Sequence, residues 1–546
     1  MAPNTVDCLS AAGNARVQVG DTIYQSENAC LAALRTTDPR HDKARIEGGK
    51  GGLLDDVYRW VLGTDEFLRW RHDEQNTLLW IKGDPGKGKT MLLCGITNEL
   101  AKEDSVLSYF FCQATDARIN SATAVLRGLI YVLVGRQPSL LSHLQKRYDH
   151  AGRQLFEDVN AWVALREIFL DILGDPALRS PYLVVDALDE CQTGRSELLD
   201  LIASGSAASR AKWIVSSRNW PEIEKKLAHA DQKVPLSLEL NASSVSAAVQ
   251  LYIQAKVRTL AEEEQYDPQT TAHVTSYLSS NARDTFLWVA LVCQSLKDVL
   301  SCKVVTLLDN FPPGLDALYG QMMQKIYGMK DPSDVALCLQ ILSIASTVYR
   351  PLTLEELGTF IDNPFEKDKP LHAKSLKTYI GLCGSFLAVR ERTTYFVHQS
   401  AKDFLCDRSL NADFQKIFPD TIGGLHHILF SKSLELLSRT LRRNIYRISH
   451  PGFSVEGVTP PSPDPLGPAQ YSCVYWVNHL FDAQPDRTPI GIGDLQDGGP
   501  VHRFLRQKYL NWLEALSLAQ AMSRGVLVIE MLNSLLHVCS KLYTSQ

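Results

Sequence analysis

Short apolar runs alternate with amphipathic stretches over the first half of the chain. Runs that are rich in aliphatic and aromatic residues and too short for helices predict buried strands at residues 77–82, 106–112, 182–186 and 212–216. Helical periodicity separates them, for example at residues 121–135. Buried strands with helices between them are typical of a parallel sheet that is covered on both faces. The pattern therefore predicts a doubly wound α/β domain, which we place at residues 46–235.

The strand pattern fades beyond Asn241, and helical periodicity takes its place. It predicts helices at residues 245–260, 286–300 and 314–329, the last after the breaker pair Pro312 and Pro313. Residues 335–405 combine helices with one predicted strand, at residues 394–397. The rest of the chain is therefore expected to be mostly helical.

The two ends of the chain carry weaker patterns. Residues 13–24 alternate between apolar and polar, which fits an edge strand, a disordered tail or a self-stacking cross-β segment. A proline-rich stretch at residues 447–470 predicts an exposed loop, and the tail from Val501 is helical again. No repeat of about 20 to 50 residues is visible, so the sequence does not encode a solenoid or a propeller.

Length, composition and charge narrow the class of protein. A chain of 546 residues, 45% apolar and 21% charged, is an ordinary globular protein with more than one hydrophobic core. Its net charge of -5 argues against nucleic acid as the main partner, because phosphate backbones attract an excess of Lys and Arg. The longest apolar stretches, such as residues 286–292, are shorter than the roughly 20 residues that span a bilayer. With no secretory signal visible, we expect a cytoplasmic protein without a membrane partner.

The cysteines form no recognisable metal or redox motif. None of the 12 belongs to a C-x-x-C pair, and several, such as Cys94, Cys293 and Cys338, lie in apolar contexts. Reduced, buried thiols are the expected state, with a disulfide framework or a zinc site as the alternatives.

A phosphate-binding motif follows the first predicted strand. The chain reads GDPGKGKT and then continues into a helical pattern, which is G-x-x-x-x-G-K-[ST] in its required context. The glycines let backbone N–H groups surround phosphate oxygens, and the helix N-terminus adds its positive end. Lys89 would bridge the β- and γ-phosphates, and Thr90 would ligate Mg²⁺. The motif predicts ATP or ADP as ligand with Mg²⁺, with GTP as the alternative, bound by Gly83, Asp84, Pro85, Gly86, Lys87, Gly88, Lys89 and Thr90.

Two further strand ends supply candidate catalytic groups. In PYLVVDALDEC a buried strand delivers Asp186 to the edge of the sheet where ligands bind, and this carboxylate would support Mg²⁺. Asp189 and Glu190 follow, where a carboxylate can orient or deprotonate a water. Arg218 ends the next strand and could sense the γ-phosphate, although it could also be a surface arginine. An acidic loop at a strand end is the alternative for the carboxylates.

Taken in order, these segments resemble the NACHT domain of fungal signal-transduction NTPases. The resemblance is carried by DPRHDKARIE, KGGLLDDVYRW, GDPGKGKTMLL, VVDALDE and IVSSRNWPEIE, then by NARDTFLWVALVCQSL, PPGLDALY, LTLEELGTFI and YFVHQSAKDFL. It covers roughly residues 28–410, with a weaker echo near the C-terminus. It implies a STAND-type switch similar to animal inflammasome receptors and plant resistance proteins.

The resemblance implies a domain order and two further site residues. It places a helical domain at residues 236–330, a winged helix at 331–410 and a helical region at 411–546. In such proteins the domains close around ADP, and exchange for ATP opens them and permits oligomerisation. The family match implies that His398 touches the ADP β-phosphate and that Pro313 lies near the nucleotide. Without the family, His398 would be a packing residue.

The sequence departs from the family at both ends. Only residues 1–45 precede the predicted NTPase domain, where the family usually carries an effector domain, and the usual array of sensor repeats does not follow. Residues 13–24 resemble short amyloid signalling motifs and could replace the effector.

Three functions stay open. The first is a switch that hydrolyses ATP or GTP slowly, assembles into a homo-oligomer and acts with an unknown protein partner in fungal immunity or self/non-self recognition. The second is a scaffold that is permanently ADP-bound or nucleotide-free, and the third is a turnover-driven motor.

Overall fold

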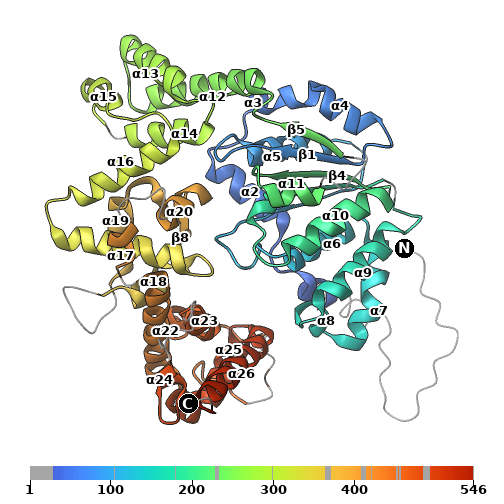
Figure 1. Cartoon of the computed structure of the whole chain (residues 1–546), viewed down its shortest axis with the longest axis vertical. Helices are drawn as coiled ribbons and strands as arrows, with labels where there is room; N and C mark the ends of the chain where they lie inside the picture. The colour runs from blue at the N-terminus through green and yellow to red at the C-terminus, as the bar shows by residue number, and fades with distance from the viewer. Residues whose placement is uncertain are drawn as a thin grey trace.

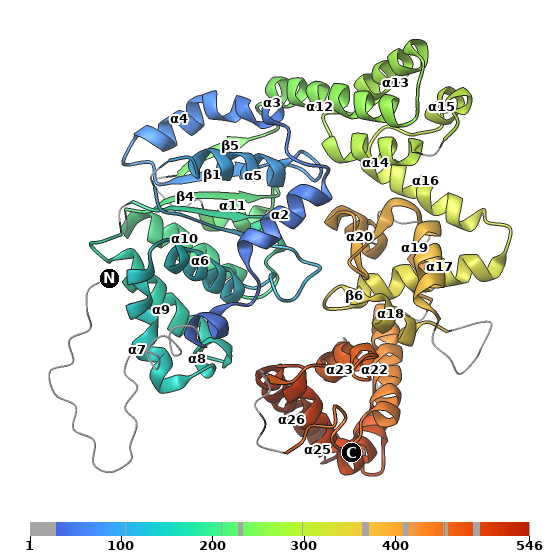
Figure 2. The ribbon, with the colours of Figure 1, turned by 180° about the vertical axis from the view of Figure 1, so that it is seen from behind.

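The computed structural model describes residues 29–544, apart from residues 104, 179, 209, 228–232, 298, 363–370, 408–413, 420, 451–452, 454–456 and 484–491. The strand predicted at residues 13–24 lies outside the described residues. Figure 1 shows an α/β part on one side and, beside it, an arc of helices that runs from α12–α15 down to α25 and α26; Figure 2 shows the same arrangement from behind.

The α/β part is built on a five-stranded parallel sheet with strand order β2-β3-β4-β1-β5. Its strands are β1 (Leu78–Lys82), β2 (Leu107–Phe111), β3 (Tyr182–Asp186), β4 (Lys212–Ser217) and β5 (Lys233–Ser237). The four predicted strands are confirmed. The fifth was missed because its sequence, KVPLS, contains Pro235, which cannot donate to a ladder and is tolerated on an edge strand such as this one.

Side chains of the sheet point alternately into two hydrophobic cores. Leu79 and Ile81 of β1 pack with α4 and α5, whereas Leu78 and Trp80 pack with α6, α9 and α10 on the opposite face. This alternation follows from the two-residue period of a strand. The doubly wound arrangement is therefore confirmed. Its helices are α2 (Pro39–Gly49), α3 (Asp55–Tyr58), α4 (Asp65–His72), α5 (Lys89–Leu100), α6 (Ala122–Arg136), α7 (Ser142–Ala151), α8 (Gln154–Glu157), α9 (Ala161–Leu173), α10 (Arg195–Ala208) and α11 (Pro221–Leu227).

Five helices follow the sheet and pack against the same core as β1. They are α12 (Ala242–Glu263), α13 (Pro268–Asn281), α14 (Phe286–Leu296), α15 (Ser301–Leu308) and α16 (Leu315–Tyr327). Asp267 caps α13 by accepting hydrogen bonds from the backbone N–H groups of Gln269 and Thr270. The helix predicted to reach residue 300 ends earlier, because Lys297 adopts an extended conformation.

The next segment contains a small antiparallel sheet with strand order β6-β8-β7. One strand was predicted here, whereas the structure contains three. The predicted strand corresponds to β8, whereas its partner β7 was missed because Glu391 and Arg392, which join the two strands, adopt positive φ angles that usually call for Gly or Asn. The elements are α17 (Pro332–Thr347), β6 (Leu352–Thr353), α18 (Leu354–Phe360), α19 (Ala373–Leu382), β7 (Leu387–Arg390), β8 (Thr393–Phe396) and α20 (Gln399–Cys406).

The C-terminal helices have a hydrophobic core of their own, which contains Trp476 and Trp512. The predicted loop at residues 447–470 is exposed only in part, because Leu466 and Ala469 at its end are buried in that core. The elements are α21 (Phe414–Ile417), α22 (Thr421–Thr440), α23 (Gln470–Asp482), α24 (Ile492–Leu495), α25 (Pro500–Leu518) and α26 (Met522–Thr544).

Two sequence expectations concern the whole chain. In the described part of the chain, no helix is both long and apolar enough to cross a membrane. The cysteines of this part are free thiols, and Cys94, Cys293 and Cys338 are buried, as expected.

Candidate functional site

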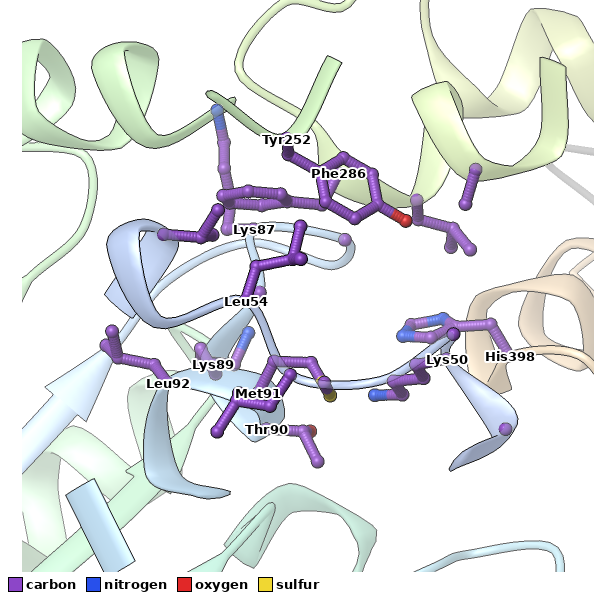
Figure 3. Close-up of a pocket in the computed structure, with 18 of the residues that line it drawn as sticks. Lys50, Leu54, Lys87, Lys89, Thr90, Met91, Leu92, Tyr252, Phe286 and His398 are labelled. Carbon is purple, nitrogen blue, oxygen red and sulfur yellow. The ribbon is translucent and has the colours of Figure 1, made fainter. Parts of the chain in front are cut away.

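A cavity of about 520 Å³ lies at the carboxyl edge of the parallel sheet, a size typical of ligand pockets. Several parts of the chain enclose it: the segment from the end of α2 through α3, the glycine-rich loop with the start of α5, the carboxyl ends of β3 and β4, the helices α12 and α14, and the segment from β7 to His398 (Figure 3). Most of the predicted site residues line it, namely Pro85, Gly86, Lys87, Gly88, Lys89, Thr90, Asp186, Asp189, Glu190, Arg218 and His398. Gly83 and Asp84 begin the same loop. Pro313 is exposed and does not line the cavity.

The glycine-rich loop is packed against the start of α14. Gly86 and Gly88 adopt positive φ angles of 78° and 86°. A Cβ on Gly86 would lie 2.8 Å from a methyl carbon of Thr285, and one on Gly88 would lie 2.9 Å from the ring of Phe286. Glycine is therefore required at both positions, by backbone conformation and by space.

Lys89 extends along the loop. Its ammonium donates hydrogen bonds to the carbonyl oxygens of Gly83, at 2.5 Å, and Asp84, at 3.0 Å. Burial lowers the pKa of Lys89, while the nearby charges of Asp189 and Asp186 oppose this effect. The ammonium thus lies against the start of the glycine-rich loop, where it can bind phosphate oxygens of a ligand.

Asp186 and Thr90 bring together the oxygen ligands that Mg²⁺ prefers. The hydroxyl of Ser216 donates to Asp186 Oδ1 at 2.5 Å and accepts from the N–H of Ala187 at 2.8 Å. Burial raises the pKa of Asp186, whereas hydrogen bonds from Ser216 and Thr90 and the charge of Lys50 favour its ionised form. A carboxylate and a hydroxyl beside a phosphate-binding loop fit the predicted metal site.

Arg218 is held between two carboxylates. Its backbone N–H donates to Asp189 Oδ1 at 3.0 Å, and its Nε lies 3.0 Å from Asp189 Oδ2. Its Nη1 lies 2.7 Å from Oδ2 of Asp403 in α20. Burial disfavours the guanidinium charge, but Asp403 and Asp189 outweigh it and raise the pKa of Arg218. Arg218 is therefore a largely buried residue of the cavity and not a surface arginine.

Glu190 is buried beside Asp189. Its Oε2 accepts a hydrogen bond from the N–H of Ala114 at 3.0 Å. Burial, reinforced by the negative charge of Asp189, raises the pKa of Glu190 to about 8. Near neutral pH this carboxyl is mostly protonated and is a poor base.

His398 is the N-cap of α20 and faces the cavity. Its Nδ1 accepts a hydrogen bond from the backbone N–H of Ser400 at 3.1 Å, and the Ser400 hydroxyl bonds to Tyr319. Burial, helped by the charges of Lys50, Arg218 and Lys89, lowers the pKa of His398 well below its usual value. The ring is therefore neutral, and because Nδ1 accepts, its proton is assigned to Nε2, which is free to donate into the cavity.

Several lining residues were not identified from the sequence. Tyr252 and Phe286 stack edge to face, with their centroids 5.4 Å apart, and form an apolar wall with Leu54 (Figure 3). Aromatic residues in helical patterns are usually predicted to be core residues, so the sequence did not indicate that Tyr252 and Phe286 line a ligand cavity. Lys50 also lines the cavity; it begins the family segment KGGLLDDVYRW and has a pair of glycines on each side, but neither feature assigned it a role.

Comparison with solved structures gives only weak similarity. Domain III of the replication initiation protein DnaA from Thermotoga maritima is 13% identical, with a TM-score of 0.27, and the match covers 48% of this chain and 99% of that one. The Aeropyrum pernix ORC1 protein in complex with DNA is 12% identical, with a TM-score of 0.25, over 65% of this chain and 96% of that one. At such scores these similarities carry no argument about fold or function.

Comparison with sequences is far more informative. A family model described as "Nephrocystin 3, N-terminal" matches residues 56–218. The vegetative incompatibility protein HET-E-1 of Podospora anserina is 51% identical over 524 residues, which are 93% of this chain but 38% of that protein. The present chain thus spans less than half the length of this curated relative. With its ordered series of motifs and its identity to HET-E-1, the chain belongs to the fungal NACHT proteins of the STAND class of P-loop NTPases.

Proposed function

We propose that the protein is a nucleotide-controlled switch that binds ATP or ADP, with GTP as the alternative, together with Mg²⁺ in this cavity. The observation that carries the proposal is the convergence of three distant segments on one site: the glycine-rich loop, the carboxyl ends of β3 and β4, and His398 with α20. A site built from separate parts of a chain can report through their relative position which ligand is bound.

Each site residue has a proposed role. The backbone of Gly83–Gly88 surrounds the phosphates, Lys89 binds the β- and γ-phosphates, and Thr90 and Asp186 hold Mg²⁺. Mg²⁺, when bound, neutralises negative charge on the phosphate oxygens. Arg218 would detect the γ-phosphate, a task that requires it to exchange its contact with Asp403 for one with the ligand.

The closed arrangement corresponds to a resting, ADP-bound state in this proposal. The Nε2–H of His398 donates to the β-phosphate and so holds residues 331–410 against residues 46–235. The three-stranded sheet β6-β8-β7 with α18 and α19 supports the assignment of 331–410 as a winged helix, after a helical domain at 236–330 and before a helical region at 411–546. Pro313 has no role in this proposal, because it is exposed and lies outside the cavity lining.

Hydrolysis is expected to be slow in this arrangement. Asp189 is engaged by Arg218, and Glu190 has a pKa of about 8, so neither carboxylate is free to accept a proton at neutral pH. Full conversion of a switch also requires about 5.5 kcal/mol of differential binding, whereas one charged hydrogen bond contributes roughly 1.5–3 kcal/mol. Several contacts around the cavity must therefore share the task.

The engagement of Asp189 and the protonation of Glu190 also favour a second candidate function, a scaffold that keeps ADP bound and does not hydrolyse ATP. The name of the relative, a vegetative incompatibility protein, favours the switch, with a role in fungal self/non-self recognition. Oligomerisation on activation, a protein partner and a cytoplasmic location are parts of this proposal.

The first experiment is to identify the nucleotide that co-purifies with the protein, by denaturing it and separating the supernatant by anion exchange. We expect stoichiometric ADP, which the variant Lys89→Ala loses. A wild-type protein that is free of nucleotide and takes up no ATP with Mg²⁺ would contradict the proposal. If the wild type does bind nucleotide, measurable turnover of ATP would exclude the second candidate, the ADP-bound scaffold.

A further inference from the structure

Lys50 lies in a glycine turn, GGKGG, between α2 and α3. The turn ends α2: the N–H of Lys50 donates to Ile46 at 3.1 Å, and the N–H of Gly52 donates to Glu47 at 2.9 Å. Gly51 and Gly52 adopt positive φ angles of 85° and 83°, which favour glycine. The backbone that carries the Lys50 side chain is thus fixed by local structure.

Side chains from β7 and α12 pack against this turn. Arg390 of β7 donates from Nη2 to the carbonyl oxygen of Gly49 at 3.0 Å. A Cβ on Gly49 would lie 2.0 Å from Arg390 Nη1, and a Cβ on Gly51 would lie 2.3 Å from Nζ of Lys256 in α12. Both neighbours therefore use the space that a side chain would occupy. Lys50 is held where β7, α12 and the α2–α3 turn meet.

The Lys50 side chain points into the cavity. Figure 3 shows it next to His398, with the nitrogen ends of both side chains directed to the interior. No hydrogen bond or ion pair to the Lys50 ammonium is recorded within the described residues. Burial is the main cause of the low pKa of His398, and Lys50 is the first of the cations that add to it.

The cavity as a whole is cationic. Among the described residues that line it, seven are Lys or Arg and four are Asp or Glu. Lys297, at the end of α14, is paired with Glu263 at 2.9 Å, whereas Lys50 forms no ion pair with the residues that the structure describes, although its charge acts on Asp186. An ammonium with three donors and no acceptor, placed beside an N–H donor, fits an anionic oxygen such as that of a phosphate.

We infer that Lys50 binds the terminal phosphate of a nucleoside diphosphate, beside His398 and opposite the glycine-rich loop. The inference rests on the proposed function and extends it to a residue outside the P-loop motif. The terminal phosphate is then held by Lys89 from one side and by Lys50 and His398 from the other. Because Arg390 and Lys256 contact the turn that carries Lys50, the contact between Lys50 and the phosphate connects the bound nucleotide to β7 and α12.

The test is the affinity of the full chain for ADP and for AMP, measured by isothermal titration calorimetry after removal of co-purified nucleotide. Lys50→Gln should raise the Kd for ADP by roughly ten- to a hundredfold, the loss expected for one charge-assisted hydrogen bond. It should leave the Kd for AMP, which has no β-phosphate, within about threefold of the wild type. Lys50→Arg keeps the charge and should recover part of the ADP affinity.

Lys297→Gln is the matched control, because it removes one positive charge from the same cavity at a site where that charge is paired. Thermal unfolding without nucleotide shows whether each variant is folded. An unchanged ADP affinity in Lys50→Gln, an equal loss for AMP, or an equal loss in Lys297→Gln would overturn the inference alone. A wild-type chain that binds no ADP would overturn the proposed function, and the inference with it.

Discussion

Arg218 and Asp403 form an ion pair that joins the end of β4 to α20, with Nη1 and Oδ2 2.7 Å apart. The same guanidinium also binds Asp189, so one side chain connects the strand end, the acidic loop and the helix that His398 begins. The group proposed to detect the γ-phosphate is therefore already engaged in the closed arrangement. A third phosphate would have to compete with Asp403 for it.

Removing Asp403 should loosen the closed arrangement. We expect Asp403→Asn to release a fluorescent ADP analogue faster than the wild type, by roughly 5- to 30-fold if the pair contributes about 1–2 kcal/mol to closure. Stopped-flow displacement with excess ADP measures the rate. Asp497→Asn, a charge change on an exposed residue of the C-terminal region, is the control. Equal release rates in both variants would show that the pair does not hold the site closed.

Turnover should depend on the protonation of Glu190. Its pKa of about 8 means that the carboxylate form becomes dominant only above that pH, so hydrolysis should rise between pH 7 and pH 9. Initial rates of phosphate release from ATP with Mg²⁺ measure this profile. Glu190→Gln, which cannot ionise, should be slow and independent of pH across the same range. A wild-type rate that is already maximal at pH 7 would contradict the role of Glu190 as the base.

The glycine-rich loop should not tolerate a methyl group at Gly88. Alanine there must adopt a φ of 86° and lies 2.9 Å from the ring of Phe286, so Gly88→Ala should lower stability by about 1–2 kcal/mol and weaken nucleotide binding. Gly63→Ala is the matched control, because nothing lies within 4 Å of its Cβ position. Thermal unfolding and ADP titration check both variants. If the two variants behave alike, Gly88 is not constrained as the structure indicates.

Acid should destabilise the protein through a buried histidine pair. Nδ1 of His426 lies 2.8 Å from Nδ1 of His479, and burial lowers the pKa of both rings, with His426 adding to the effect on His479. The unfolded chain therefore binds protons that the folded chain does not, and stability falls as the pH drops below about 6.5. Urea unfolding at pH 7.5 and pH 5.5 should show this loss.

The variant His426→Gln removes one of the two buried sites and should reduce the loss of stability between the two pH values. His427→Gln is the control, because that ring is partly exposed and hydrogen-bonded to Asp494 at 2.8 Å. An equal loss in the wild type and both variants would place the acid sensitivity elsewhere.

Local patterns carried most of what the sequence could predict. The strands β1–β4 are continuous apolar runs, and the glycine-rich loop is a motif of fixed spacing, so both are visible within a few residues. The strand β6 has only two residues, β7 leads into a turn without the usual Gly or Asn, and β5 contains a proline. Such segments become strands because a neighbouring strand supplies their hydrogen bonds.

The missed parts of the site depend on contacts between distant residues. The motif with Asp403 was visible in the sequence, but nothing there shows that this carboxylate reaches Arg218. Lys50 similarly gains its position from Arg390 and Lys256, which approach through the space that two glycines leave open. Pro313 shows the converse case, since a family motif suggested a role but the chain places the residue at the surface.

The two ring nitrogen atoms of His398 have different partners. Nδ1 accepts a hydrogen bond from the backbone N–H of Ser400 in the first turn of α20, and Nε2 faces the cavity. If a phosphate binds to Nε2, the rigid imidazole ring connects that phosphate directly to the N-terminus of α20. Rotation of the imidazole cannot then free the ligand without also uncapping α20. Ligand release and fraying of that helix would be a single event, and an alanine at this position would mimic the loss of ligand and the loss of the cap at once.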